Sequence, residues 1–118
     1  MSDPSDCLFC AIVAGRIPAA RVFESDDVIG FEDIHPQAPV HVLFIPRKHI
    51  ANANALTDED AGLVAQLMLA ARDYAQEVGI ADAGYRLVMN CNPHGGQTVY
   101  HIHLHLLGGA QLPGGFGV

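Results

Sequence analysis

Three histidines near the C-terminal end of the chain alternate with apolar residues. By residue type and spacing they are the strongest candidates for a chemical role in the sequence. They are His101, His103 and His105, with Ile102 and Leu104 between them. Successive side chains of a β-strand point to opposite faces, so the three imidazoles would share one face and the apolar residues would face a core. Such a row favours metal binding or catalysis over a role in solubility.

The spacing of the histidines limits what they can do together. Neighbours in the row would lie about 6.7 Å apart and the outer pair about 13 Å apart, so two could share a metal ion but three could not. A neutral imidazole is a competent nucleophile, and a neighbour that stays protonated would stabilise phosphate charge. The row therefore suits phosphoryl or nucleotidyl transfer, with the central His103 as the best candidate nucleophile.

A glycine-containing loop, residues 92–98, leads directly into the histidine row. Gly95 and Gly96 would let backbone N–H groups approach a ligand closely, and concavities of this kind bind phosphate oxygens. Thr98 adds a hydroxyl group. A simple hairpin turn is the alternative interpretation, but the adjacent histidines favour an anion site.

Two cysteines near the N-terminus, Cys7 and Cys10, leave three interpretations open. A Cys-x-x-Cys pair can be redox-active, although that function usually accompanies a βαβ unit, which the pattern lacks. The pair can also be buried, inert thiols. The third possibility is half of a tetrahedral zinc site, for which His49 and His101 are the candidate histidine ligands.

The remaining polar candidates are isolated in the sequence. His35, His41 and His94 are interpreted as surface or hydrogen-bonded structural histidines rather than catalytic ones. Asp33 lies between a predicted strand and a proline-rich loop. There it could accept hydrogen bonds from ligand hydroxyls or cap a turn.

Hydrophobic periodicity predicts an α+β fold with one antiparallel sheet of about five strands. A short helix is expected within residues 5–15, capped by Ser5 or Asp6, and a long helix within residues 57–79. Gly62, inside the long helix, suggests close packing at that point. The expected strands cover residues 21–24, 28–33, 40–46, 85–91 and 99–107.

Composition narrows the class of protein. The 118 residues suffice for a single domain, and half of them are apolar. The formal net charge of -7 argues against binding nucleic acid through its backbone. The acidic N-terminus is not a secretory signal, no apolar run could span a membrane, and three cysteines do not make a disulfide framework, so we expect a cytoplasmic protein. Residues 1–4 and 113–118 are expected to be flexible.

The histidine row also carries a family resemblance. Residues 97–107 match the pattern His-φ-His-φ-His-φ-φ, with φ apolar, that is the signature of the histidine-triad (HIT) family, and the chain resembles the Hint branch of that family. The resemblance extends from about residue 7 to residue 112. Further segments that resemble the Hint branch are residues 31–39, 45–50, 84–88 and 107–109.

The resemblance implies a fold, an activity and a set of site residues. Two five-stranded sheets would join into one ten-stranded sheet in a homodimer. The activity would be hydrolysis of nucleoside 5′-phosphoramidates or related adenylates through a nucleotidyl-histidine intermediate, with a purine, AMP-like nucleotide as substrate and no organic cofactor. The implied catalytic residues are His101, His103, His105 and Thr98. The implied substrate-binding residues are Phe9 and Ile34 for the base, Asp33 for the ribose, His103 and His105 at the phosphate, and Asn90, Gly96, Gln97, Thr98 and Val99 around it. The implied ligands of a structural zinc are Cys7, Cys10, His49 and His101.

Two departures from the family pattern bear on specificity. The C-terminal tail, residues 111–118, lacks the tryptophan of the best-known Hint members, which leaves the leaving-group preference open. His94 precedes the two glycines and is a candidate for the substrate mouth.

Two other functions compete with the phosphoramidase hypothesis. The first is a dinucleoside polyphosphate hydrolase of the fragile-histidine-triad branch, whose members tend to be longer after the triad. The second is a non-catalytic, nucleotide-binding regulatory protein, against which the presence of all three histidines counts.

Overall fold

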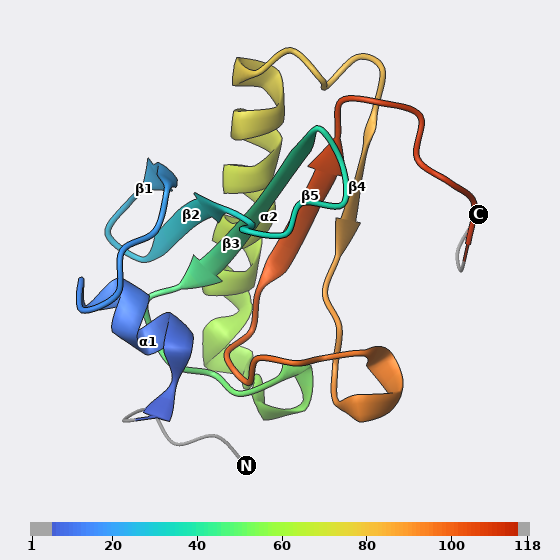
Figure 1. Cartoon of the computed structure of the whole chain (residues 1–118). Coiled ribbons are helices and arrows are strands. Elements are labelled where there is room, and N and C mark those ends of the chain that lie inside the picture. Colours follow the sequence, from blue (N-terminus) through green and yellow to red (C-terminus); the bar gives the residue numbers. More distant parts are fainter. Residues whose placement is uncertain (1–5, 116–118) are drawn as a thin grey trace.

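The computed structural model describes residues 6–115, which fold around a five-stranded antiparallel sheet (Figure 1). The strand order is β1-β2-β3-β5-β4, so the predicted α+β fold class is confirmed. Of the ends expected to be flexible, residues 1–4 and 116–118 lie outside the described residues. The strands are β1 (Arg21–Glu24), β2 (Val28–Glu32), β3 (Val40–Pro46), β4 (Tyr85–Val88) and β5 (Leu104–Gly108), and the α-helices are α1 (Leu8–Val13) and α2 (Ala61–Glu77).

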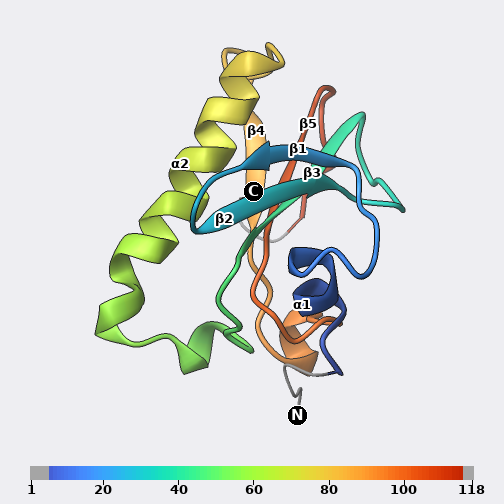
Figure 2. The same ribbon diagram turned by 90° about the vertical axis from the view of Figure 1, so that its left-hand side faces the viewer.

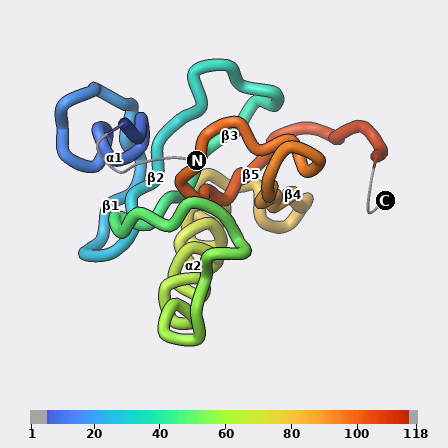
Figure 3. The backbone as a smooth tube through the Cα atoms, turned by 90° about the horizontal axis from the view of Figure 1, so that it is seen from below, coloured from blue at the N-terminus to red at the C-terminus, as the bar shows by residue number. Residues whose placement is uncertain are grey.

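The two helices lie on opposite faces of the sheet (Figures 2 and 3). Alternation along the central strand β3 explains this arrangement, because successive side chains of a strand point to opposite faces. Val42 and Phe44 are fully buried in the cluster that α2 covers. Leu43 and Ile45 belong to the second cluster, which the residues of α1 complete. The short helix is thus brought against the sheet face that carries the histidines.

The long helix begins after a capped turn, as the sequence predicts. Thr57 donates its backbone N–H to Asp60 Oδ2 (2.9 Å), and Lys48 Nζ donates to Asp60 Oδ1 (2.7 Å). The buried carboxylate of Asp60 therefore joins the start of α2 to the segment that follows β3. The prediction of close packing at Gly62 is wrong, because a Cβ added there would meet nothing within 4 Å.

The histidine strand is shorter than predicted. It begins at Leu104 rather than at residue 99, so His101 and His103 precede the strand and only His105 lies within it. The register of β3 with β5 pairs Phe44 with Leu104 and would bring Ile102 opposite Pro46. Because proline has no N–H to donate, the ladder ends before that pair. The strand β4 is also shorter than predicted, because its pairing with β5 ends at Val88, opposite His105.

The N-terminal helix is also shorter than predicted, and its cap is different. Cys7, not Asp6, is the N-cap of α1, because Cys7 Sγ accepts a hydrogen bond from the backbone N–H of Cys10 (3.3 Å). Ser5, the other predicted cap, lies outside the described residues. One cysteine of the pair therefore fixes the start of the helix that carries the other.

Candidate active site and metal centre

His103 is held by the backbone of the first histidine in the row. Its Nδ1 lies 2.9 Å from the carbonyl oxygen of His101. Because a carbonyl oxygen can only accept, Nδ1 carries the proton and the lone pair is on Nε2. The ring is buried and meets Phe9 edge-on, with the centroids 5.1 Å apart. Burial lowers the pKa of His103, so the ring is neutral at pH 7 with a nucleophilic Nε2.

His105 is the end of a hydrogen-bonded chain that begins at the backbone of Gln37. The N–H of Gln37 donates to His41 Nδ1 (3.0 Å), so His41 must carry its proton on Nε2. His41 Nε2 lies 2.9 Å from His105 Nδ1 and therefore donates to it. In the neutral ring of His105 the proton is consequently on Nε2. His105 thus offers an N–H donor beside the lone pair of His103, whose ring centroid is 4.9 Å away.

A protonated neighbour is one way to stabilise phosphate charge, but burial disfavours a charged His105 in the free protein. Burial, followed by the nearby charges of His103 and His41, lowers the pKa of His105 to about 4. Burial also lowers the pKa of His41, partly offset by Asp33. A neutral His105 stabilises a phosphate oxygen as a hydrogen-bond donor rather than as a cation.

Asp33, His41 and His105 lie close enough to be considered as metal ligands. The hydrogen bonds argue against that role. His41 Nδ1 already accepts from Gln37, so His41 Nε2 bears a proton and has no lone pair for a metal ion. Asp33 Oδ2 instead lies 3.5 Å from His41 Nε2, and Asp33 Oδ1 accepts the N–H of His35 (2.8 Å). This group is a hydrogen-bonded chain.

A second group, Cys7, Cys10, His49 and His101, has the chemistry of a metal centre. Its four ligand atoms lie within 4.8 Å of one another. Cys10 Sγ is 3.2 Å from His49 Nδ1 and 3.5 Å from His101 Nδ1, and Cys7 Sγ is 3.4 Å from His101 Nδ1. Tetrahedral zinc would place sulfur and nitrogen ligands about 3.6 Å apart, so these separations are compatible with that ion.

The second ring nitrogen of His101 completes this arrangement. His101 Nε2 donates to the carbonyl oxygen of Pro46 (2.8 Å), which leaves the lone pair on Nδ1, facing the thiols. Burial and the neighbouring Cys7 raise the pKa of Cys10 to about 11. Without a metal ion the Cys10 side chain is therefore a thiol, whereas a bound cation would favour the thiolate.

The other predicted site residues occupy different environments. Phe9 packs edge-on against His101 and His103, whereas Ile34 is 86% exposed beside Asp33. The amide nitrogen of Asn90 lies 3.8 Å from where a Cβ of Gly96 would be, so the Asn90 side chain lies near Gly96. The isolated His35 and His94 are exposed. His41 is the site residue that the sequence interpretation underrated, and only the pairing of β3 with β5 brings it to His105.

The glycine loop does not offer the N–H groups that the sequence suggested. Gly95 donates to Asn92 O, Gly96 donates to Pro93 O and Gln97 donates to Asn92 O, each at 3.1 Å. Further along the loop, the backbone N–H groups of Thr98 and Val99 have no acceptor within the described residues 6–115. The predicted roles of Gly96 and Gln97 in substrate binding therefore stay predictions. Hydrogen bonds within the loop already use the backbone N–H groups of both residues.

Comparison with known proteins agrees with this geometry. A family described as "Scavenger mRNA decapping enzyme C-term binding" matches residues 6–116. The purine nucleoside phosphoramidase of Escherichia coli K12 is 45% identical over 107 residues, which cover 91% of this chain and 90% of that protein. The chain belongs to the histidine-triad (HIT) family. An uncharacterized HIT-like protein from Synechocystis is 48% identical over 88% of this chain and 90% of its own length.

Solved structures of HIT proteins share the fold. A HIT family hydrolase from Legionella pneumophila has a TM-score of 0.90 at 54% identity and covers 92% of this chain and 96% of its own. A histidine triad protein from Clostridium difficile has a TM-score of 0.91 at 38% identity and covers 97% of this chain and 98% of its own. The protein is therefore a HIT-family hydrolase. In the described part of the chain, no helix is long and apolar enough to cross a membrane.

The neutral His105 makes stability depend on pH. Its pKa is about 4 in the folded state and near 6.5 in an unfolded chain, so its contribution is fully present above pH 6.5 and is lost as the pH falls from 6.5 toward 4. The free energy of unfolding, measured with urea, should fall less between pH 7 and 5 for His105→Asn than for the wild type. The difference should be up to about 1.4 kcal/mol per pH unit. The matched control is the exposed His94→Asn, which should follow the wild type. Equal slopes for all three proteins would contradict the buried, neutral state of His105.

Proposed function

We propose that this HIT protein hydrolyses nucleoside 5′-phosphoramidates, or related adenylates, through a nucleotidyl intermediate on His103. The observation that carries the proposal is the hydrogen bond from His103 Nδ1–H to the His101 carbonyl oxygen (2.9 Å), which directs the lone pair to Nε2. The name of the E. coli relative, purine nucleoside phosphoramidase, supports the substrate class.

The geometry suggests how the two half-reactions would proceed. The Nε2 lone pair of His103 attacks the phosphorus atom and a P–N bond to the ring forms. The bond to the leaving group breaks, and that group takes a proton from solvent water as it departs. The positive charge on the His103 ring is stabilised by the His101 carbonyl oxygen. His105 donates Nε2–H to a phosphoryl oxygen. Water then cleaves the P–Nε2 bond, which releases the nucleoside monophosphate and restores neutral His103.

The rest of the nucleotide would bind next to these histidines. Asp33 Oδ2 is an acceptor for ribose hydroxyls, and its side chain is held by the backbone N–H of His35. Phe9 and Ile34 are the apolar residues proposed for the base, and the high exposure of Ile34 suits a side chain that a ligand covers. These roles support a purine, AMP-like substrate.

Replacement of the nucleophile tests the catalytic proposal. His103→Ala should reduce hydrolysis of adenosine 5′-phosphoramidate by at least about 1,000-fold, because no covalent intermediate can form, while AMP binding remains measurable by calorimetry. The exposed His35→Ala is the matched control and should retain activity. Adenylates and dinucleoside polyphosphates assayed with the same preparation would rank the substrates. Hydrolysis by His103→Ala at the wild-type rate would show that the nucleophile is a different group.

We further propose that the metal centre holds a structural zinc ion. Zinc suits two thiolates and two imidazoles, and it would tie Cys7 and Cys10 of the α1 region to His49 and His101. The ion would supply a fixed tetrahedral anchor. His101 would then be held at both ring nitrogens, by the metal and by the Pro46 carbonyl oxygen, and its own carbonyl oxygen orients His103.

Metal analysis tests the zinc proposal. The purified protein should contain close to one zinc per chain, and Cys7→Ser should contain far less and melt at a lower temperature, because the anchor of α1 is lost. Cys91→Ser, at the free cysteine outside the centre, should keep its zinc. Less than about a tenth of an equivalent in the wild type, with thiols that titrate as free, would exclude the zinc centre.

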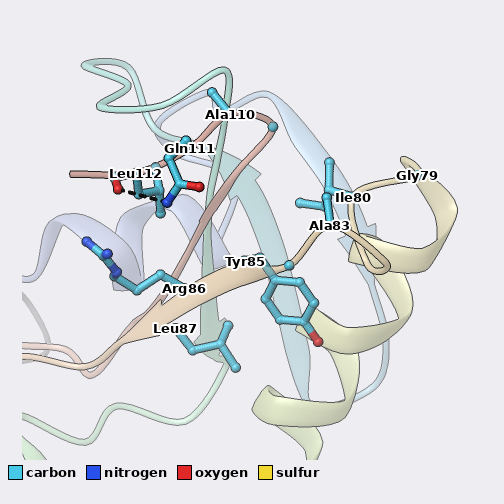
Figure 4. A pocket seen from close by; sticks show the side chains of 11 residues that line it. Gly79, Ile80, Ala83, Tyr85, Arg86, Leu87, Ala110, Gln111 and Leu112 are labelled. Carbon is cyan, nitrogen blue, oxygen red and sulfur yellow. Dashed lines mark hydrogen bonds between the residues drawn. The ribbon is translucent and has the colours of Figure 1, made fainter. Parts of the chain in front are cut away.

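The open edge of β4 supports a homodimer. Among the described residues 6–115, β4 ends the sheet order and pairs only with β5, so within this range its outer edge has unpaired backbone groups. Tyr85 and Leu87 on this edge line a groove of about 690 Å³, together with Ile80 and the C-terminal Leu112 (Figure 4). We propose that the β4 edges of two copies pair antiparallel, which would give a ten-stranded sheet.

Sedimentation velocity tests the dimer proposal. The protein should sediment with twice the mass of one chain at micromolar concentration, since pairing satisfies the backbone groups of both edges and covers both grooves. A monomer at concentrations well above those of the assay would contradict it.

A further inference from the structure

Gln97 is a buried polar residue whose hydrogen bonds all go to the protein. Its side chain is only 5% exposed. The amide oxygen accepts the N–H of Asn92 (2.8 Å), and the amide nitrogen donates to the carbonyl oxygens of Ala51 (2.8 Å) and Val99 (3.1 Å). Both amide protons of the side chain are thus used, and its backbone N–H donates to Asn92 O. Gln97 has no donor left for a substrate.

Asn92, which donates its backbone N–H to the Gln97 side chain, has a strained backbone. Asn92 has φ 63° and ψ 179°, a strained backbone conformation that residues other than glycine rarely adopt. Several hydrogen bonds impose it. Asn92 O accepts from Gly95 and Gln97, its N–H donates to the Gln97 side chain, and its Oδ1 accepts from Asn52 Nδ2 (2.9 Å). Strain that the surroundings impose in this way is concentrated at sites of ligand binding and catalysis.

The consequence of these contacts is a particular arrangement of donors. The N–H groups of Gly95, Gly96 and Gln97 are used inside the loop, whereas those of Thr98 and Val99 have no acceptor within residues 6–115. Gln97 holds the Val99 carbonyl oxygen and so fixes the chain that follows these two donors. Val99 also packs against the cluster that contains Phe9, whose ring centroid lies 5.1 Å from that of His103.

We infer that Gln97 is a positioning residue: with Asn92 and Asn52 it holds the N–H groups of Thr98 and Val99 as a preformed pair of donors for the substrate phosphate. This assigns Gln97 a different role from direct substrate contact. The inference rests on the proposed function, because the phosphate is that of the nucleotide. Donors fixed before the ligand arrives cost no reorganisation when charge develops on the phosphate, which is the condition for effective transition-state stabilisation.

Binding of AMP and of adenosine to the same variants tests the inference. Gln97→Met has a similar length, adds no charge and removes all three side-chain hydrogen bonds. It should weaken AMP binding by about 10-fold or more, while adenosine, which has no phosphate, binds within about twofold of the wild type. Gln66→Met, at an exposed position of α2, is the matched control and should change neither affinity.

A second variant decides the question if Gln97→Met does not fold. Asn52→Ser keeps an oxygen for the N–H of Ala55, which Asn52 Oδ1 accepts at 3.0 Å, but loses the Nδ2 donor to Asn92. It should weaken AMP binding about threefold and leave adenosine binding unchanged. In the wild type, the amide resonances of Thr98 and Val99 should shift on addition of AMP more than those of Gly95 and Gly96.

Each outcome separates the inference from the proposed function. Equal weakening of AMP and adenosine by both variants, or unchanged AMP affinity in both, overturns the positioning role even if the wild type hydrolyses phosphoramidates. A wild type that binds AMP through the Thr98 and Val99 amides but leaves phosphoramidates intact overturns the proposed reaction and supports the donor pair. A wild type that binds no AMP overturns both.

Discussion

The geometry of the site depends on one hydrogen bond, between the Nδ1–H of His103 and the carbonyl oxygen of His101. It selects the tautomer in which Nε2 carries the lone pair, so it decides whether the buried ring can act as a nucleophile. The acceptor is itself fixed, because the ring of His101 donates to Pro46 and faces the two thiols of the metal centre. The position of the reactive nitrogen is therefore set by contacts with β3 and with the start of α1, residues far from it in the sequence.

Much of this arrangement could be predicted from the sequence, because residue type and alternation are local properties. The β-branched, apolar run Val40–Pro46 predicts the central strand with its correct bounds, and the capping pair Thr57 and Asp60 predicts the turn from which the long helix starts. The four residues proposed as zinc ligands do come together. The start of β5 could not be predicted in this way, since it depends on which residue of β3 lies opposite Ile102. Continued register would place Pro46 there, and because Pro46 has no N–H to donate, the ladder ends at Leu104.

His41 shows the same limit for the site itself. In the sequence it is one histidine in an apolar strand, and nothing near it suggests chemistry. The antiparallel pairing of β3 with β5 places it beside His105, and the N–H of Gln37 then determines which of its nitrogens carries the proton. The tautomer of His105 follows from a backbone group 68 positions earlier in the chain. Register and tautomer are properties of the folded chain, so a sequence pattern alone could not assign His41 its place.

The neutrality of the buried histidines has a consequence for how ligands arrive. In the free protein the rings of His41, His103 and His105 are held uncharged by burial, and the whole chain has a formal charge of -7. An anionic nucleotide is thus not drawn toward these rings by long-range attraction, and the net negative charge of the chain opposes its approach, most of all at low ionic strength. Selection among anionic ligands then depends on the hydrogen bonds that form once a ligand is in the site. The directions of the donor N–H groups matter more for this selection than the charge of the ligand.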